Sequence, residues 1–137
     1  MKKLVFVLFV SLIGISCSVD DVKSDYYYEI LPIESYELPT SFELGKIYTI
    51  KVSYKRPTDC HTKPSLYFEK NGNTRTIAIQ SLVVNRGDCQ PVPDEEPKEG
   101  TFQFEVLSSE PYLFKFYKGQ NENDEDVFEE VTVPVYY

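Results

Sequence analysis

The feature that most restricts the fold of this chain is a series of short segments in which apolar and polar residues alternate. In residues 46–55, KIYTIKVSYK, an apolar side chain occupies every second position from Tyr48 to Tyr54. Residues 101–107 and 112–118 repeat this pattern with Phe, Tyr and Val. Because successive side chains of a strand point to opposite faces, a period of two indicates a strand with one buried face. No segment shows a convincing helical period, so the sequence predicts an all-β protein.

A hairpin is indicated at Asn71-Gly72, which separates two such runs, residues 65–70 and 74–80. Asn-Gly is a strong hairpin signal because both residues tolerate a positive φ. The hairpin predicts an antiparallel pair of strands. Residues 108–111, SSEP, form a second tight connection.

Prolines interrupt the first and the last predicted strands. Pro32 lies within residues 26–38, and Pro134 lies within residues 128–137. Proline cannot donate a hydrogen bond to a strand ladder, so it is confined to edges, ends and bulges. Both terminal strands are therefore expected at sheet edges.

About seven short strands in one domain predict an immunoglobulin-like antiparallel β-sandwich, with a small open β-barrel as the alternative. Tyr112 opens the penultimate strand, where a tyrosine corner would place it. The chain has no Trp, and no Cys lies in its second or sixth predicted strand. The similarity to immunoglobulin domains therefore concerns the architecture alone.

The N-terminus has the composition of a secretory signal. Lys2 and Lys3 precede twelve uncharged residues, 4–15, and then the small residue Ser16. A membrane span needs about 20 apolar residues, so this run is too short to be a permanent anchor. We expect residues 1–16 to be a signal peptide, residues 17–25 a tether and residues 26–137 one domain.

Cys17, directly after this run, resembles the lipidated cysteine of bacterial lipoproteins. Ser16 fits their cleavage motif, whereas Gly14 stands where the family prefers Leu. The following residues, SVDD at 18–21, resemble the acidic stretch of Bacteroidetes surface lipoproteins. The resemblance implies a lipid anchor in the outer membrane, with the protein at the cell surface or, alternatively, at the periplasmic face. Ordinary signal cleavage near Ser16 or Ser18 is the other interpretation.

Lipidation of Cys17 would leave Cys60 and Cys89, a pair in an oxidising compartment. We expect them to form a disulfide, with two free buried thiols as the alternative. The acidic balance of the chain, with a net charge of −8, argues against nucleic acid as a partner. Removing residues 1–16, which hold two lysines and no acid, makes the charge two units more negative.

The connections at residues 56–64, 85–100 and 119–126 are the longest, and a sandwich places them at one end. Binding residues often lie on loops of a rigid scaffold. We therefore name this end as the candidate binding pole. Its candidate residues are Asp59, His61, Arg86, Asp88, Asn121, Asn123, Asp124 and Asp126.

Metal and catalytic sites are weaker interpretations. Residues 119–126 offer oxygen ligands for calcium but lack the EF-hand spacing. Cys60, His61 and Cys89 lack a fourth zinc ligand, and bridged sulfurs cannot act as nucleophiles. We expect no cofactor and no enzymatic activity.

Tyrosines cluster at the two ends of the expected domain, at residues 26–28 and 136–137. Tyrosines can stack on sugars or fill pockets of a protein partner, and they can also simply cover the sandwich from edge strands. The sequence favours the structural interpretation.

The expected function is that of a non-catalytic, membrane-anchored binding module of the bacterial envelope. Its ligand would be an unknown protein or glycan. One alternative is a structural accessory of an outer-membrane assembly that adds strands at residues 26–38 or 128–137. A weaker alternative is a small inhibitor of secreted hydrolases.

Overall fold

The computed structural model describes residues 25–137, and every regular element in this range is a β-strand. The predicted signal peptide (1–16), Cys17 and the tether up to residue 24 lie outside the described residues. No helix in the described range is long and apolar enough to cross a membrane. The strands are β1 (Tyr26–Leu31), β2 (Ser35–Glu37), β3 (Phe42–Glu43), β4 (Ile47–Tyr54), β5 (His61–Asn71), β6 (Thr74–Val84), β7 (Lys98–Glu105), β8 (Tyr112–Gln120), β9 (Asp126–Val133) and β10 (Val135–Tyr136).

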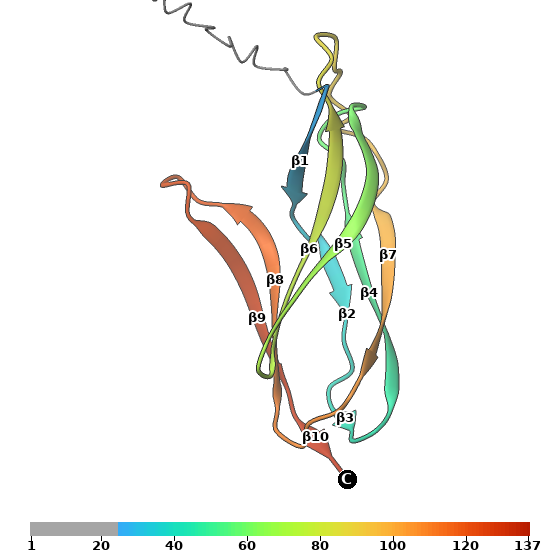
Figure 1. Ribbon diagram of the computed structural model, residues 1–137, viewed down its shortest axis with the longest axis vertical. Coiled ribbons are helices and arrows are strands. Elements are labelled where there is room, and N and C mark those ends of the chain that lie inside the picture. Colours follow the sequence, from blue (N-terminus) through green and yellow to red (C-terminus); the bar gives the residue numbers. More distant parts are fainter. Residues whose placement is uncertain (1–24) are drawn as a thin grey trace, which may run out of the picture.

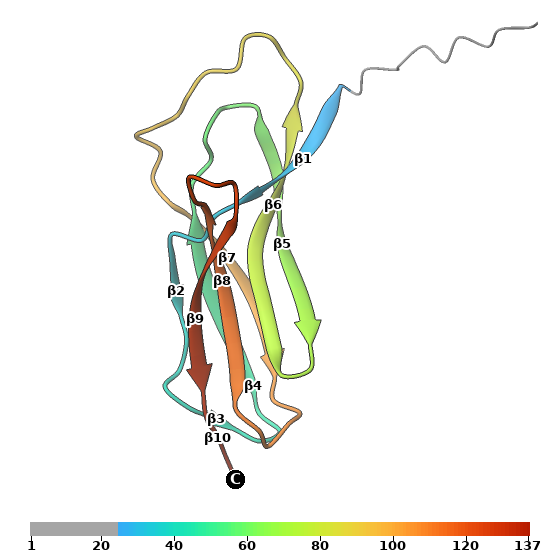
Figure 2. The same cartoon turned by 90° about the vertical axis from the view of Figure 1, so that its left-hand side faces the viewer.

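The strands form two main sheets. The larger sheet has the order β1-β6-β8-β9, with β5 paired to β6, and the smaller sheet has the order β2-β4-β7. A short parallel pair of β3 and β10 lies at the end near the C-terminus (Figure 1). The strands of both sheets run along the long axis of the molecule (Figure 2). The prediction of a β-sandwich is confirmed, and the sheets do not close into a barrel.

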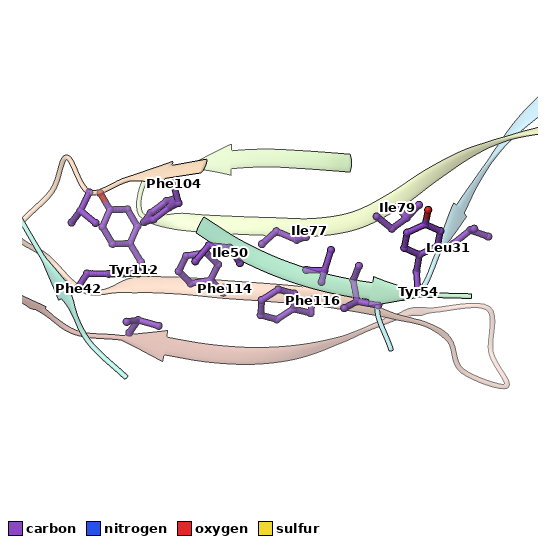
Figure 3. Packing of buried hydrophobic residues seen from close by; sticks show 14 residues of the cluster. Leu31, Phe42, Ile50, Tyr54, Ile77, Ile79, Phe104, Tyr112, Phe114 and Phe116 are labelled. Carbon is purple, nitrogen blue, oxygen red and sulfur yellow. The ribbon is translucent and has the colours of Figure 1, made fainter. Parts of the chain in front are cut away.

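The core lies between the two sheets and is rich in aromatic rings. Figure 3 shows the apolar side chains of β4 and β7 meeting those of β6 and β8. The residues that the alternating pattern placed on one face are the buried ones. They include Ile50, Val52 and Tyr54 on β4, Phe104 on β7, Ile77 and Ile79 on β6, and Phe114 and Phe116 on β8.

The first predicted strand divides at Pro32, as its sequence suggested. β1 pairs with β6 in the larger sheet, whereas β2 pairs with β4 in the smaller one. Leu31 and Ile33, on either side of the proline, are both buried in the core. The break in the ladder therefore lets one segment contribute to both sheets.

The predicted hairpin joins β5 to β6, but its turn is shifted by one residue. Asn71 pairs with Thr74, so the central residues are Gly72 and Asn73. Gly72 has a φ of +55°, as a turn with glycine at its first central position requires. The Asn73 side chain instead donates hydrogen bonds to the 108–111 turn, to Ser108 Oγ at 3.0 Å and Glu110 O at 3.1 Å.

The tyrosine corner is present. The Tyr112 hydroxyl accepts hydrogen bonds from Leu107 N at 3.1 Å and from Ser108 N at 2.9 Å. The ring is fully buried against Phe104, with ring centroids 4.9 Å apart. One side chain thus fixes the connection between β7 and β8.

The strand order departs from that of an immunoglobulin domain at β6. In constant-type immunoglobulin domains the fourth strand belongs to the opposite sheet from the sixth. The fourth and sixth strands predicted from the sequence, residues 74–80 and 112–118, are parts of β6 and β8. These two strands pair in parallel over Thr74–Ile77 and Leu113–Phe116. β1 pairs with the remainder of β6, from Ile79 to Val84. β1 and β8 therefore share one edge of β6 and separate from each other beyond it (Figure 1).

Candidate functional site

The disulfide predicted from the cysteine count is formed. Cys60 and Cys89 are joined with an S–S distance of 2.04 Å. The bond ties the β4–β5 loop (55–60) to the β6–β7 loop (85–97). We call these two loops the disulfide loops.

The charged residues of the disulfide loops contact one another. Arg86 lies 3.2 Å from an Asp59 carboxylate oxygen and 3.4 Å from one of Asp88, and its Nε is 3.3 Å from Cys60 Sγ. Gln90 N donates to Asp59 Oδ1 at 2.9 Å. This hydrogen bond and the Arg86 charge lower the pKa of Asp59. The candidate residues here thus hold the two loops together.

Two ion pairs at Glu95 connect the disulfide loops to each other and to the start of β7. Arg56 forms a bidentate contact with the Glu95 carboxylate and also donates to His61 O at 3.3 Å. Lys98 lies 3.4 Å from Glu95. The hydrogen bond from Arg56 is the main cause that lowers the pKa of Glu95 to about 2, and Lys98 acts in the same direction.

His61 is the first residue of β5 and is buried, with 4 % of its surface exposed. Thr58 N donates to its Nδ1 at 3.3 Å, so the neutral ring carries its proton on Nε2. Nε2 lies 3.1 Å from Glu29 Oε2. A loop position accessible to ligand was expected, but β5 begins earlier than the alternation suggested and takes His61 into the sheet.

The β8–β9 turn (121–125) reaches the same end of the molecule but is separated from the disulfide loops (Figure 1). Asn121 Oδ1 accepts hydrogen bonds from Asn123 N at 2.9 Å and from Glu125 N at 3.1 Å. Asp124 has a φ of +59°, in the left-handed region that Asp tolerates. The Asn121 amide is thus used within the turn itself.

Among the described residues, the carboxylates of this turn do not gather into a group of possible metal ligands. Within residues 25–137, the one group of three possible ligand side chains is Asp59, Cys60 and Cys89, and both sulfurs are in the disulfide. The carboxylates of 119–126 therefore form no calcium cage in the part of the chain described, and the thiolates of the zinc interpretation are not available.

A groove lies where β1 and β8 separate. Its volume is about 600 Å³, and it opens on the face of the larger sheet that points away from the core. We call it the tyrosine groove, after the rings that line it. The lining residues are Tyr28, Glu29, Ile30, Tyr67, Glu69, Thr76, Ala78, Tyr117, Gln120, Asp126 and Phe128.

Aromatic rings form much of the wall of the tyrosine groove. Tyr28 of β1 is 62 % exposed and Tyr67 of β5 is 38 % exposed. The opposite wall is formed by Tyr117 of β8 and Phe128 of β9, whose ring centroids lie 5.8 Å apart. Lys115 Nζ lies 4.8 Å from the centre of the Phe128 ring. A second hollow of about 590 Å³ adjoins it at Tyr28. Its lining residues are Tyr26, Tyr28, Lys63, Ser65, Gln80 and Leu82.

The charged side chains that line the tyrosine groove, among residues 25–137, are the carboxylates of Glu29, Glu69 and Asp126. Lys115, beside the Phe128 ring, is paired with Glu130 at 3.2 Å. The hydrogen bond from Tyr67 to Glu69 raises the pKa of Tyr67. Burial, followed by the charges of Asp126 and Glu29, raises the pKa of Tyr117.

Of the eight candidate residues, Asp126 alone lines the tyrosine groove. The sequence did carry a signal for this site, since β1 (YYYEIL) and residues 66–68 (LYF) have apolar side chains on both faces. A strand with one buried face requires them on one face only. That excess leaves apolar side chains exposed on the larger sheet.

No protein-family model matches this chain, and neither a curated protein nor a solved structure is similar enough to count as a match.

Proposed function

We propose that this protein is a non-catalytic binding module of the bacterial cell envelope, and that the tyrosine groove is its ligand site. Cys17 would carry the lipid that holds it in the outer membrane, at the cell surface or alternatively at the periplasmic face. The ligand is a protein or a glycan.

The observation that carries this proposal is the tyrosine groove itself. Ligand sites combine apolar and aromatic walls with a few polar groups that fix orientation. Tyr28 and Tyr67 present rings to solvent, while Thr76, Gln120 and Asp126 add a hydroxyl, an amide and a carboxylate. Tyrosine gives a large contact area at a low cost in conformational entropy, which suits both peptide and sugar ligands.

We propose no catalytic role because the candidate nucleophiles and the candidate base already have other partners. Cys60 and Cys89 are joined, so neither sulfur can attack a substrate. His61 is buried and hydrogen-bonded to Thr58 and Glu29. Binding without chemistry therefore accounts for these residues more simply than catalysis.

The proposed anchor would hold the groove near the membrane. Residues 18–25 extend less than about 30 Å when fully stretched, at no more than about 3.5 Å per residue. β1 starts at Tyr26, which lines the hollow beside the tyrosine groove. A ligand that is itself attached to the envelope would meet the groove more often than a freely diffusing one.

A photo-crosslinking amino acid at Tyr28, introduced in intact cells, tests the ligand site. We expect an adduct that is absent when the same amino acid replaces Thr49, an exposed residue of β4 in the opposite sheet. Equal adducts at both positions, or none at Tyr28, would refute the assignment of the groove.

Protease treatment of intact cells and a Cys17→Ser variant test the address. Lipidation predicts that the variant leaves the membrane fraction, since the acyl chains supply the anchoring free energy of about 0.8 kcal/mol for each buried methylene. Digestion of the native protein on intact cells would indicate the cell surface, and protection would indicate the periplasmic face. A variant that stays membrane-bound would contradict the anchor.

The accessory role in an outer-membrane assembly is a second candidate. It is favoured by one observation, the position of β1 at the end of its sheet. An unpaired strand edge is a template for a strand from another chain.

A further inference from the structure

On both sides of the tyrosine groove, the backbone belongs to strands that have no neighbouring strand there among residues 25–137. Within this range β1 is the last strand of its sheet and pairs with β6 alone. β8 pairs with β6 over Leu113–Phe116 and with β9 along its length, so its continuation to Gln120 has β9 alone as a partner. The groove is thus bounded by two strand edges that face each other.

The pairing shows which peptide groups of β1 face the groove. Asn85 N donates to Asp25 O at 2.7 Å, in the same register that pairs Glu29 with Ser81. In an antiparallel pair, every second residue directs its N–H and C=O toward the partner strand. Asp25 and Glu29 therefore bond toward β6, and the backbone groups of Tyr28 and Ile30 point away from it.

The apex of the groove is closed by the backbone. Ile33 N donates to Tyr117 O at 2.8 Å, just beyond the end of β1. β1 is antiparallel to β6, and β6 is parallel to β8, so β1 and β8 run in opposite directions on either side of the opening. Ala78, which lies on β6 between the two pairing ranges, lines the groove with a small side chain.

The groove also has a charge preference. Glu29, Glu69 and Asp126 line it, and within residues 25–137 none of these three forms an ion pair with a lysine or an arginine. Their hydrogen-bond partners are His61, Tyr67 and Gln120. A cation entering the groove would meet three carboxylates without displacing a basic side chain.

We propose that the tyrosine groove binds an extended, positively charged segment of a partner protein, which adds to the larger sheet as a strand along the free edge of β1. This inference rests on the proposed function, because it names the occupant of the same groove. Main-chain hydrogen bonds to Tyr28 and Ile30 supply affinity in this mode, and the pockets for alternate side chains supply specificity. A glycan could stack on the rings, but it has no peptide backbone to pair with the N–H and C=O groups of Tyr28 and Ile30.

A second copy of the chain is a poorer occupant. Each copy carries a net charge of −8, and each groove is negative. Like charges brought together in an interface oppose association. A basic strand satisfies both the free edge and the charge.

The test uses the purified full-length protein in detergent micelles and a short, capped peptide of alternating valine and lysine. Hydrogen–deuterium exchange with mass spectrometry follows the backbone amides. We expect slower exchange in residues 26–31 and 117–120 when the peptide is added, and no change in β4. Binding should weaken with added salt, because exposed charges are screened.

Two further peptides separate this proposal from less specific binding. A peptide methylated at alternate backbone amides cannot donate to a strand edge and should bind at least about tenfold more weakly. The same peptide with glutamate in place of lysine should show no measurable binding. Equal affinity for the methylated peptide, or for the glutamate peptide, would overturn the proposal.

Variants of the protein give the complementary test. Ile30→Pro removes a donor from the free edge while leaving the residues that bond to β6 unchanged, so peptide binding should be lost. Glu69→Gln and Asp126→Asn should each weaken binding about two- to fivefold. Glu37→Gln, which removes a carboxylate paired with Lys51 on the opposite sheet, is the matched control and should bind normally. An effect of Glu37→Gln as large as that of Glu69→Gln would contradict a groove-specific charge effect.

The two proposals can fail separately. Crosslinking at Tyr28 without peptide binding would retain the groove as a ligand site and overturn the strand partner. An adduct that proves to be an oligosaccharide, or dimers crosslinked through Tyr28, would overturn it as well. Failure to crosslink anything at Tyr28 would refute the proposed function itself.

Discussion

The disulfide loops and the tyrosine groove use similar residue types in opposite ways. In the disulfide loops, Asp59 is paired with Arg86, and Glu95 is paired with Arg56. In the groove, the hydrogen-bond partners of Glu69 and Asp126 within residues 25–137 are neutral, and the rings of Tyr28 and Tyr67 are exposed. Charge alone therefore does not mark a binding surface.

The difference shows that a loop of polar residues needs specific bonds to fix its conformation. The disulfide loops have little apolar surface to bury, so a covalent bond and ion pairs restrict them. The groove needs no such restraint, because its residues lie on strands whose inner faces are fixed by the core. Its outward side chains are left to contact something else, and exposed apolar surface of this kind commonly marks an interaction site.

The largest change in stability is expected when the disulfide is removed. Replacing Cys60 and Cys89 with alanine together should lower the free energy of unfolding by about 3–4 kcal/mol, because the bond closes a loop whose ends are 29 residues apart. Chemical denaturation measures the change. If the disulfide loops are only structural, the double variant should still bind the groove ligand once folded. Loss of binding with a native fold would place the site at the loops.

A smaller effect is expected from His61, which connects the two regions through Glu29. His61→Ala should lower the free energy of unfolding by about 1–3 kcal/mol, since it leaves a buried cavity and removes the partners of Thr58 N and Glu29. Thermal unfolding measures it. Thr58→Val removes a hydroxyl that lies 2.9 Å from His61 Nδ1 and keeps the ring, so it separates the loss of this contact from the loss of the ring. Wild-type stability of His61→Ala would show that the two regions are independent.

Acid should loosen the disulfide loops through Glu95. Its pKa is about 2 in the folded chain and is close to 4.5 when unperturbed. A carboxylate with a lowered pKa stabilises the fold above its unfolded pKa, and this contribution is lost as the pH falls from about 4.5 to about 2. Unfolding measured across this range should show less pH dependence for Glu95→Gln than for the native chain. Identical curves would contradict the role assigned to the Arg56 contact.

Replacing Tyr28 should have the smallest effect on stability. Its effect on binding should be large. Its ring is 62 % exposed, so Tyr28→Ala should change the free energy of unfolding by no more than about 0.5 kcal/mol. Binding of the groove ligand should nevertheless fall, and isothermal titration would measure the loss. The control is Tyr137→Ala, which removes an exposed ring at the opposite end of the sandwich. If Tyr28→Ala and Tyr137→Ala bound the ligand with the same affinity, Tyr28 would have no part in binding.

Much of the fold was predictable because it depends on local pattern. The alternation in residues 46–55 identified the buried face of β4, and Pro32 identified the point at which the first predicted strand divides. Tyr112 was expected at a corner and forms it. Each of these predictions needs only a few neighbouring residues and a strand geometry.

Arg75 shows where local pattern stops being sufficient. It occupies an inward position of β6, and its guanidinium is buried over the Tyr112 ring, 5.0 Å from the centre. It donates to Gly72 O at 2.7 Å and Thr74 O at 2.8 Å, and burial lowers its pKa. Nothing in the sequence near Arg75 predicts that ring, because Tyr112 belongs to another strand.

The candidate site was predicted only in part for the same reason. The disulfide was expected because the resemblance to lipoproteins assigns Cys17 to the lipid and leaves two cysteines, and the loops were identified by their length. The use of Asp59, Arg86 and Asp88 to brace one another depends on distances between loops that are far apart in the sequence. The tyrosine groove depends on the parallel pairing of β6 with β8, a long-range contact that alternation cannot indicate.

The sequence by itself determined that this chain makes strands, which of their faces are buried, and which two cysteines could pair. These properties follow from the chemistry of single residues and the period of two. The tertiary structure alone decided that β1 and β8 divide one edge of β6 between them and leave a groove lined with tyrosines. Strand order is set by packing across the whole core, where residues distant in the chain compete for the same edge.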